Sequence, residues 1–170
     1  MTAEARASLA DLARLKDEIA ADRRALSRCL DDMRSVVQAW GPQAVDRAHL
    51  ALAAVALHGY YSALEAIIER AARILDNSVP SGETWHRDLL SQGMTEIPGL
   101  RPAVLPRELY GDLVALLEFR HFFRHAYAVE LDASKLRQNL DRALAVEPPV
   151  SQALDEFGDF LNRAMKSLSG

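Results

Sequence analysis

Apolar residues recur at helical spacing along almost the whole chain. Between residues 12 and 40 they return every seven positions, with further apolar residues beside them. The repeating positions are Leu12, Ile19, Leu26, Met33 and Trp40. This period predicts one long amphipathic helix that ends at Gly41 and Pro42. At ~1.5 Å per residue it would exceed about 50 Å. We therefore expect it either to kink or to pack its end on another molecule.

Four further helical segments follow the first. We expect a second helix over residues 44–76, a short one in "TWHRDLLSQ", and a fourth over about 106–130 with Pro106 in its first turn. The last should begin after Asp132 as N-cap, break at Pro148-Pro149 and continue to about residue 168. No alternating strand pattern competes. The sequence thus predicts an all-α, up-and-down bundle of four to five helices in a single domain over residues 1–170.

Composition narrows the function classes. The 170 residues carry a formal net charge of −4, so any nucleic-acid contact must come from a local patch. Cys29 is the only cysteine, which excludes an internal disulfide and argues against a cysteine-based zinc site. No run of about 18 apolar residues is free of charge, and the N-terminus lacks the apolar stretch of a signal peptide. We expect no membrane span and a cytoplasmic location.

The stretch "FRHFFRHAY" at residues 119–127 places charge inside an otherwise apolar helix. At about 100° per residue, Arg120, Arg124 and Tyr127 lie within roughly 60° of one another. A different side of the helix carries Phe119, Phe122, Phe123 and Ala126. We interpret the aromatic side as core. The cationic side should face something else, because burying unpaired charge costs several kcal/mol.

Three interpretations of this cluster compete. One is an ordinary solvated face. The second is a metal site, because His121 and His125 have the i, i+4 spacing of a zinc pair. However, an intervening Glu and a clear third ligand are missing, and Arg124 adds positive charge. The third is phosphate chemistry, since arginine binds phosphate with two parallel hydrogen bonds and histidine moves protons near neutral pH.

Guanidinium, imidazole and phenol within two turns suit attack of an RNA 2′-hydroxyl on its own phosphodiester. That step needs a base, an acid and stabilisation of the phosphorane, but no metal. Arg120 and His125 point roughly 140° apart on one helix. Two copies related by a two-fold axis could each supply both residues to a shared cleft. The cationic side would then lie at a subunit interface that stays open to substrate.

The spacing Arg120-x4-His125-x-Tyr127, with "GETWHRDLL", "RPAVLP" and "YAVELD" around it, resembles the R-x4-H-x-Y motif of HepT-type toxins in the HEPN superfamily. The similarity extends over about residues 10–165. The resemblance implies a dimeric, metal-independent endoribonuclease that needs no cofactor and cleaves RNA in a cleft between protomers.

Residue roles follow from the same resemblance. Arg120 and His125 would be catalytic, His121 would support them, and Arg124 could share the duty of Arg120. Tyr127 matches the tyrosine that a partner antitoxin, an MntA-like nucleotidyltransferase, modifies with AMP in type VII-like toxin–antitoxin pairs. The alternative function is a non-catalytic module that binds a nucleotide or such a nucleotidyltransferase through the same groove.

Two residues outside the motif are further candidates. Glu65 lies on one side of the second helix, where it could pair with Arg120 and orient it, or simply lie at the solvent boundary. His86 could reach the cleft, but we favour a structural role beside Trp85.

Overall fold

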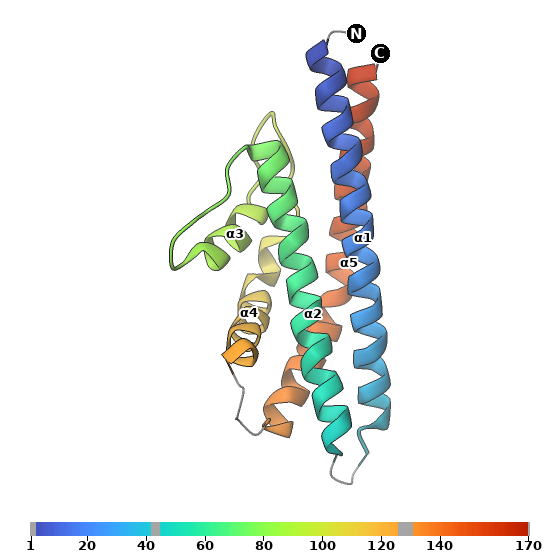
Figure 1. Ribbon diagram of the computed structural model, residues 1–170, viewed down its shortest axis with the longest axis vertical. Helices are drawn as coiled ribbons and strands as arrows, with labels where there is room; N and C mark the ends of the chain where they lie inside the picture. The colour runs from blue at the N-terminus through green and yellow to red at the C-terminus, as the bar shows by residue number, and fades with distance from the viewer. Residues whose placement is uncertain (1–2, 42–44, 126–130, 170) are drawn as a thin grey trace.

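The computed structural model describes residues 3–41, 45–125 and 131–169. Within these ranges five α-helices pack against one another and no sheet is present (Figure 1). The helices are α1 (Ala3–Ala39), α2 (Arg47–Ala71), α3 (Trp85–Gly93), α4 (Tyr110–His125) and α5 (Ala133–Ser169). The four longer helices run alternately up and down, and the short α3 lies beside α2. The predicted all-α bundle is confirmed.

The longest helices, α1 and α5, pack against each other in antiparallel directions. Arg23 forms an ion pair with Asp155 at 2.5 Å, and Arg34 lies 3.6 Å from Glu147. Their outer ends, which carry the two chain termini, project together past the other helices (Figure 1). The helix α1 is continuous from Ala3 to Ala39, and contact of its end with another molecule stays a prediction.

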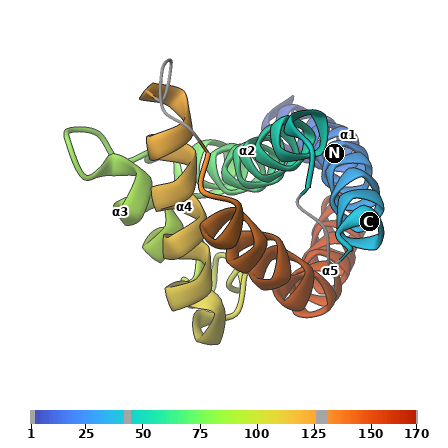
Figure 2. The ribbon, with the colours of Figure 1, turned by 90° about the horizontal axis from the view of Figure 1, so that it is seen from below.

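The last helix is continuous through Pro148 and Pro149, so the predicted break is wrong. Each proline lacks an N–H, and the carbonyl four residues earlier loses its helical hydrogen bond. Val146 and Val150 are buried on either side of the prolines, and this packing holds the helix together across them. The helix changes direction along its length (Figure 2), as proline inside a helix commonly causes.

The central helix of the bundle is α2, which contacts α1, α3, α4 and α5. Asp46 caps its start by accepting a hydrogen bond from the backbone N–H of His49 at 2.9 Å. At its other end the π-helical turn η1 (Ala72–Asp76) extends it to the predicted limit. The stretch Arg47–Asp76 is long and apolar enough to cross a membrane. However, 56% of its most apolar 18-residue segment is buried inside the structure. We read it as the core helix.

The segment between α3 and α4 is held by a buried ion pair that the sequence did not indicate. Arg101 is 3% exposed, and its guanidinium contacts both carboxylate oxygens of Asp76 at 2.5 and 2.6 Å. The same side chain also donates to the backbone carbonyls of Thr95 and Pro102 in the loop and of Gln92 at the end of α3. This pair ties the loop to the end of η1.

The two ends of α4 differ in how well the sequence predicted them. Pro106 is not in the first turn of α4: it is extended and precedes the short 3-10 turn η2 (Arg107–Leu109), and α4 begins only at Tyr110. After α4, Asp132 accepts hydrogen bonds from the backbone N–H groups of Ser134 and Lys135. This confirms the predicted N-cap of α5.

A close approach of backbone to side chain fixes α3 against α2. A methyl group built on Gly93 would lie 2.5 Å from Cγ2 of Ile68, closer than real contacts allow. Only glycine therefore lets the two helices come this near. His86 lies two turns before Gly93 on the same face of α3, and Glu65 lies one turn before Ile68 on α2. The contact therefore places His86 beside Glu65.

Candidate functional site

Arg120 of α4 is buried within its own chain, with 8% of its surface exposed. Its Nη2 lies 3.0 Å from Oε1 of Glu65 on α2, and its Nε donates to Oγ of Ser62 at 3.1 Å. Its Nη1 is also buried and has no hydrogen-bond partner in the described structure. The expectation that Arg120 lies outside the core is wrong, because Glu65 supplies the opposite charge. Among the described residues, only Nη2 and Nε of the guanidinium have partners.

Glu65 divides its two carboxylate oxygens between two helices. Oε1 faces Arg120, as expected from the sequence, whereas Oε2 lies 2.6 Å from Nδ1 of His86 on α3. A carboxylate only accepts hydrogen bonds, so Nδ1 of His86 carries the hydrogen. The side chain of Glu65 is only 8% exposed, which rules out the alternative of a residue at the solvent boundary.

The backbone explains why these side chains meet. Ser62 and Glu65 are one turn apart on the side of α2 that packs against α4. Arg120 continues the buried stripe of α4 that begins with Leu113 and Leu116. Packing of these sides of α2 and α4 against each other brings the guanidinium toward the carboxylate.

His86 is more than a structural residue beside Trp85. Its ring stacks on the Trp85 indole with centroids 3.6 Å apart, as the structural interpretation suggested. It also contacts the ring of His121 on α4 edge to face, with centroids 4.7 Å apart. The sequence interpretation missed its contact with Glu65, because no local pattern links residues that are 21 positions apart.

Two neutral imidazoles surround Arg120. Burial lowers the pKa of His121, and the neighbouring His86 and Arg120 lower it further. Burial, followed by the charges of Arg120 and Arg124, lowers the pKa of His58, whose ring packs near Phe123. Both rings therefore remain uncharged to a lower pH than an ordinary histidine, and the positive charge of the site comes mainly from arginine.

His125 lies at the exposed end of α4. Its Nδ1 is 2.8 Å from the backbone carbonyl oxygen of His121. Because a carbonyl can only accept, the neutral ring must carry its hydrogen on Nδ1 and its lone pair on Nε2. The helix backbone thus sets the tautomer in which Nε2 can act as a base.

The aromatic side of α4 differs from the expectation. Phe119 is buried at 9% exposure, but Phe122 is 46% exposed and is not a core residue. The angular pattern alone did not show which neighbours the helix has on that side. Arg124 is exposed, as expected for the cationic stripe. Ala126 and Tyr127 lie outside the described residues.

Metal binding finds little geometric support in the described ranges. Over residues 3–41, 45–125 and 131–169, no group of three or more His, Cys, Asp or Glu side chains is arranged to hold a metal ion. Within these ranges the pair His121 and His125 therefore has no third ligand. His125 instead uses Nδ1 for the backbone carbonyl of His121.

Comparison with known protein families matches residues 52–161 to the HepT-like proteins. The match covers more than half of the chain, from α2 into α5, and includes Glu65, His86, Arg120 and His125. The chain belongs to the HepT-like family, within the HEPN proteins. Comparisons with curated proteins and with solved structures found no match.

Proposed function

We propose that this protein is a metal-independent endoribonuclease toxin of a type VII-like toxin–antitoxin pair. Family membership is consistent with a HEPN ribonuclease. The observation that carries the proposal is the state of Arg120. Its charge is held in place by Glu65 and Ser62, while its buried Nη1 has no acceptor among the residues that the structure describes. A preorganised, partly unused guanidinium is suited to bind a phosphate oxygen.

The chemistry divides between Arg120 and His125. Nε2 of His125 accepts the proton of the RNA 2′-hydroxyl as the 2′-oxygen attacks phosphorus. Arg120 stabilises the negative charge that builds on the phosphorane oxygens. The bond from phosphorus to the 5′-oxygen then breaks, and an acid protonates the leaving oxygen. The products are a 2′,3′-cyclic phosphate and a 5′-hydroxyl.

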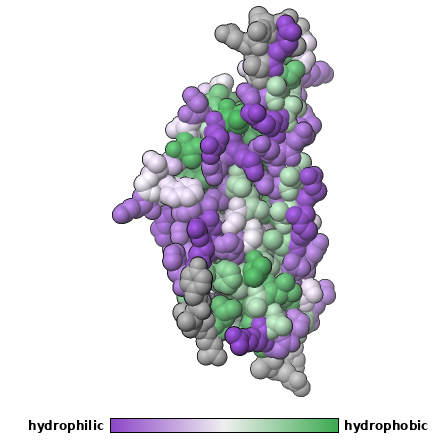
Figure 3. Space-filling view, in the orientation of Figure 1, coloured by the Kyte–Doolittle hydropathy of each residue, from purple (hydrophilic) through white to green (hydrophobic). Residues whose placement is uncertain are grey.

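A second copy of the chain supplies the second imidazole in this proposal. The first half of α2 has an exposed face of small and apolar residues: Ala48, Ala51, Leu52 and Val55. Leu52 is 38% and Val55 is 58% exposed. Figure 3 shows hydrophobic residues gathered over the lower half of α2. Ser62, two turns beyond Val55 on α2, holds Arg120, so a partner on this face lies close to the edge of the site.

The partner antitoxin of the proposal is an MntA-like nucleotidyltransferase that transfers AMP to Tyr127. This assignment rests on the match of Tyr127 to the R-x4-H-x-Y motif. Bound AMP would add bulk and negative charge two residues beyond His125 and would compete with substrate phosphate.

RNA cleavage by the purified protein tests the proposal. We expect cleavage in EDTA, with products that end in a 2′,3′-cyclic phosphate, because Arg and His carry the reaction without a metal. RNA that is 2′-O-methylated throughout is the matched control and should remain intact. Activity that disappears on chelation and returns with zinc or magnesium would contradict the mechanism. Binding of RNA with no cleavage would favour the non-catalytic alternative.

A further inference from the structure

We infer that His86 is a positioning residue, which keeps Nη1 of Arg120 free for substrate by occupying the second carboxylate oxygen of Glu65. The inference deepens the proposed function and rests on it, because it assumes that Nη1 receives the substrate phosphate. Neither the motif nor the family match assigns this role to a residue of α3.

The geometry of the pair between Arg120 and Glu65 is unusual. Arginine and carboxylate commonly pair through two parallel hydrogen bonds. Here only Nη2 contacts Oε1 at 3.0 Å, and Nε is turned to Ser62. The second oxygen, Oε2, is held by His86 at 2.6 Å. The carboxylate therefore has one strong acceptor for Arg120 instead of two.

Removing the hydrogen-bond donor of His86 would leave two unsatisfied groups side by side. One is Oε2 of Glu65, whose side chain is 8% exposed. The other is Nη1 of Arg120, which is already buried and has no partner within residues 3–41, 45–125 and 131–169. An unpaired buried acceptor and an unpaired buried donor are each costly, so they should turn toward each other. Arg120 would then hold Glu65 through both nitrogens and lose its free donor.

The ring of His86 is well fixed for this task. Trp85 stacks on it, and His121 meets it edge to face. The close contact between Gly93 and Ile68 sets the distance between α3 and α2. Since α3 packs on both α2 and α4, the imidazole meets the carboxylate at the junction of three helices.

Four variants of the full chain separate positioning from a general structural role. His86→Phe retains a ring for Trp85 but removes the donor. His86→Asn retains a donor near the position of Nδ1 and should act as the conservative rescue. Glu65→Gln has only one accepting oxygen, so it cannot form a two-bond pair with Arg120. The double variant Glu65→Gln, His86→Phe tests whether the loss of activity in His86→Phe arises from a new contact between Arg120 and Oε2 of Glu65.

We expect His86→Phe to lower kcat for RNA cleavage by about tenfold or more, up to the ~10²–10³-fold loss of a whole transition-state donor. His86→Asn should recover most of this rate. The double variant should cleave faster than His86→Phe, although it carries one more substitution. A merely structural role predicts the opposite order, because two defects in one packed site would add. A double variant that cleaves RNA more slowly than His86→Phe would overturn the inference.

A second measurement does not depend on cleavage. The crystal structure of His86→Phe should show Nη1 and Nη2 of Arg120 both on Glu65. Its affinity for 2′-O-methylated RNA should fall relative to wild type and His86→Asn. If wild type fails to cleave RNA but this structural change and order of affinities appear, only the proposed enzymatic function is wrong. If folded His86→Phe still shows only Nη2 of Arg120 in contact with Glu65, the proposed role of His86 is wrong. His49→Phe, which also removes a histidine contact with a carboxylate, is the matched control.

Discussion

The imidazole of His125 and the backbone carbonyl of His121 lie one turn apart on α4 and are joined by a hydrogen bond of 2.8 Å. This bond uses the nitrogen that is not needed for proton transfer. It leaves Nε2 with its lone pair at the exposed end of the helix. The contact ties the orientation of the proposed base to the helix itself, and no core packing depends on the ring.

His125→Ala should therefore abolish cleavage without unfolding the protein. Loss of a general base typically costs ~10²–10⁴ in rate, whereas alanine is well tolerated in an exposed helical position. Single-turnover cleavage and circular dichroism measure the two effects separately. His49→Ala serves as the control at a histidine outside the site. A folded His125→Ala protein that cuts RNA as fast as wild type would refute the mechanism.

Arg120 and Arg124 should behave differently when changed. Arg120→Lys keeps a positive charge beside Glu65 but lacks the planar fork, so it should fold and lose ~10²–10³ in kcat. Arg124→Ala should have a much smaller effect, because Arg124 is exposed and screened by solvent. Steady-state kinetics on one RNA substrate compares them. A larger loss in Arg124→Ala would transfer the main phosphate contact to Arg124.

Arg120→Ala should also destabilise the fold. It removes one partner of a buried ion pair and leaves Glu65 with only His86, which typically costs about 3–5 kcal/mol. Urea denaturation measures this loss, with Arg124→Ala as the matched removal of an exposed arginine. Equal stability of the two variants would show that the pair of Arg120 and Glu65 contributes little to folding.

The apolar face of α2 should mediate dimer formation. Val55→Glu places a charge where a stable interface of more than ~1,200 Å² would exclude water, so it should convert a dimer into an 18.8 kDa monomer. Leu100→Glu is the control, since Leu100 is also exposed but lies in the loop before α4. Light scattering at tens of micromolar gives the masses. A wild-type monomer would contradict the two-fold cleft.

The free energy of unfolding should decrease as the pH falls below about 6.5. His58 and His121 have lowered pKa values in the folded chain. Below the ordinary histidine pKa of ~6.5 the unfolded chain therefore binds more protons than the folded chain, which favours unfolding. The stability contributed by the neutral rings is present above this pH and is lost as the pH falls toward the folded values. Urea denaturation at pH 7.5 and 5.5 should show a smaller difference in His58→Gln and His121→Gln. An unchanged difference would assign the effect to other groups.

Tyr127 should be the site of AMP addition. Intact-mass analysis after co-expression with the partner nucleotidyltransferase should show one or more additions of AMP that disappear in Tyr127→Phe. Tyr110→Phe is the matched control, because Tyr110 is 38% exposed at the start of α4, whereas Tyr60 and Tyr61 are buried. Modification that survives in Tyr127→Phe would move the site elsewhere.

Helical periodicity predicted most of the fold because each long helix buries one continuous side. It allowed the pairing of Glu65 with Arg120 as one of two alternatives, but it placed Arg120 outside the core, because the pattern does not show that Glu65 is buried opposite the guanidinium. The break at Pro148-Pro149 was wrong because packing of Val146 and Val150 outweighs the local loss of hydrogen bonds. The helix propensities of single residues do not include the energy of such packing.

The contacts that sequence reasoning missed all depend on segments without a strong period. His86 reaches Glu65 only because Gly93 lets α3 approach Ile68. Arg101 finds Asp76 across an irregular loop. In both cases the two partners lie in different elements. Neither His86 nor Arg101 is part of a periodic pattern from which its partner could be predicted.

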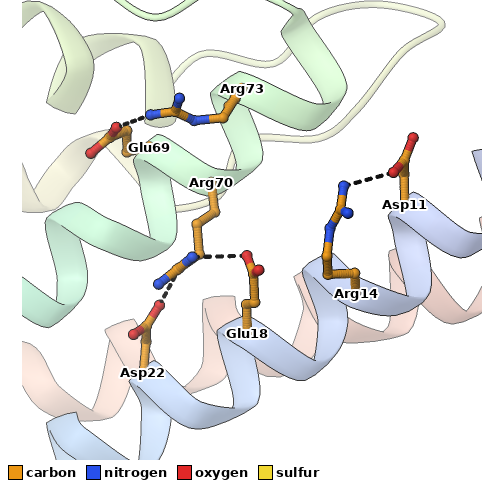
Figure 4. Close-up of polar contacts among 7 residues, drawn as sticks. All are labelled: Asp11, Arg14, Glu18, Asp22, Glu69, Arg70 and Arg73. Atoms are coloured by element: carbon orange, nitrogen blue, oxygen red, sulfur yellow. Dashed lines mark hydrogen bonds and ion pairs between the residues drawn. The ribbon is translucent and has the colours of Figure 1, made fainter.

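Further ion pairs join α2 to α1 away from the site. Arg70 of α2 bridges Glu18 and Asp22 of α1 at 2.8 Å each, while Arg73 pairs with Glu69 and Arg14 with Asp11 on single helices (Figure 4). Arg73 and Arg14 are mostly exposed, so each of their pairs should contribute less than about 1 kcal/mol. The bridge at Arg70 is partly buried and fixes how α1 and α2 lie against each other.

The burial of Arg120 and the exposure of His125 imply a particular spectrum of spontaneous escape mutants. Under the proposed function, an escape mutant that loses the charge of Arg120 or Glu65 also removes a partner of a buried ion pair, so such alleles should yield little protein. Alleles that change His125 have no such handicap. Among alleles that remove the charged or titratable group of Arg120, Glu65 or His125, those that still yield full amounts of the chain should therefore lie at the exposed end of α4.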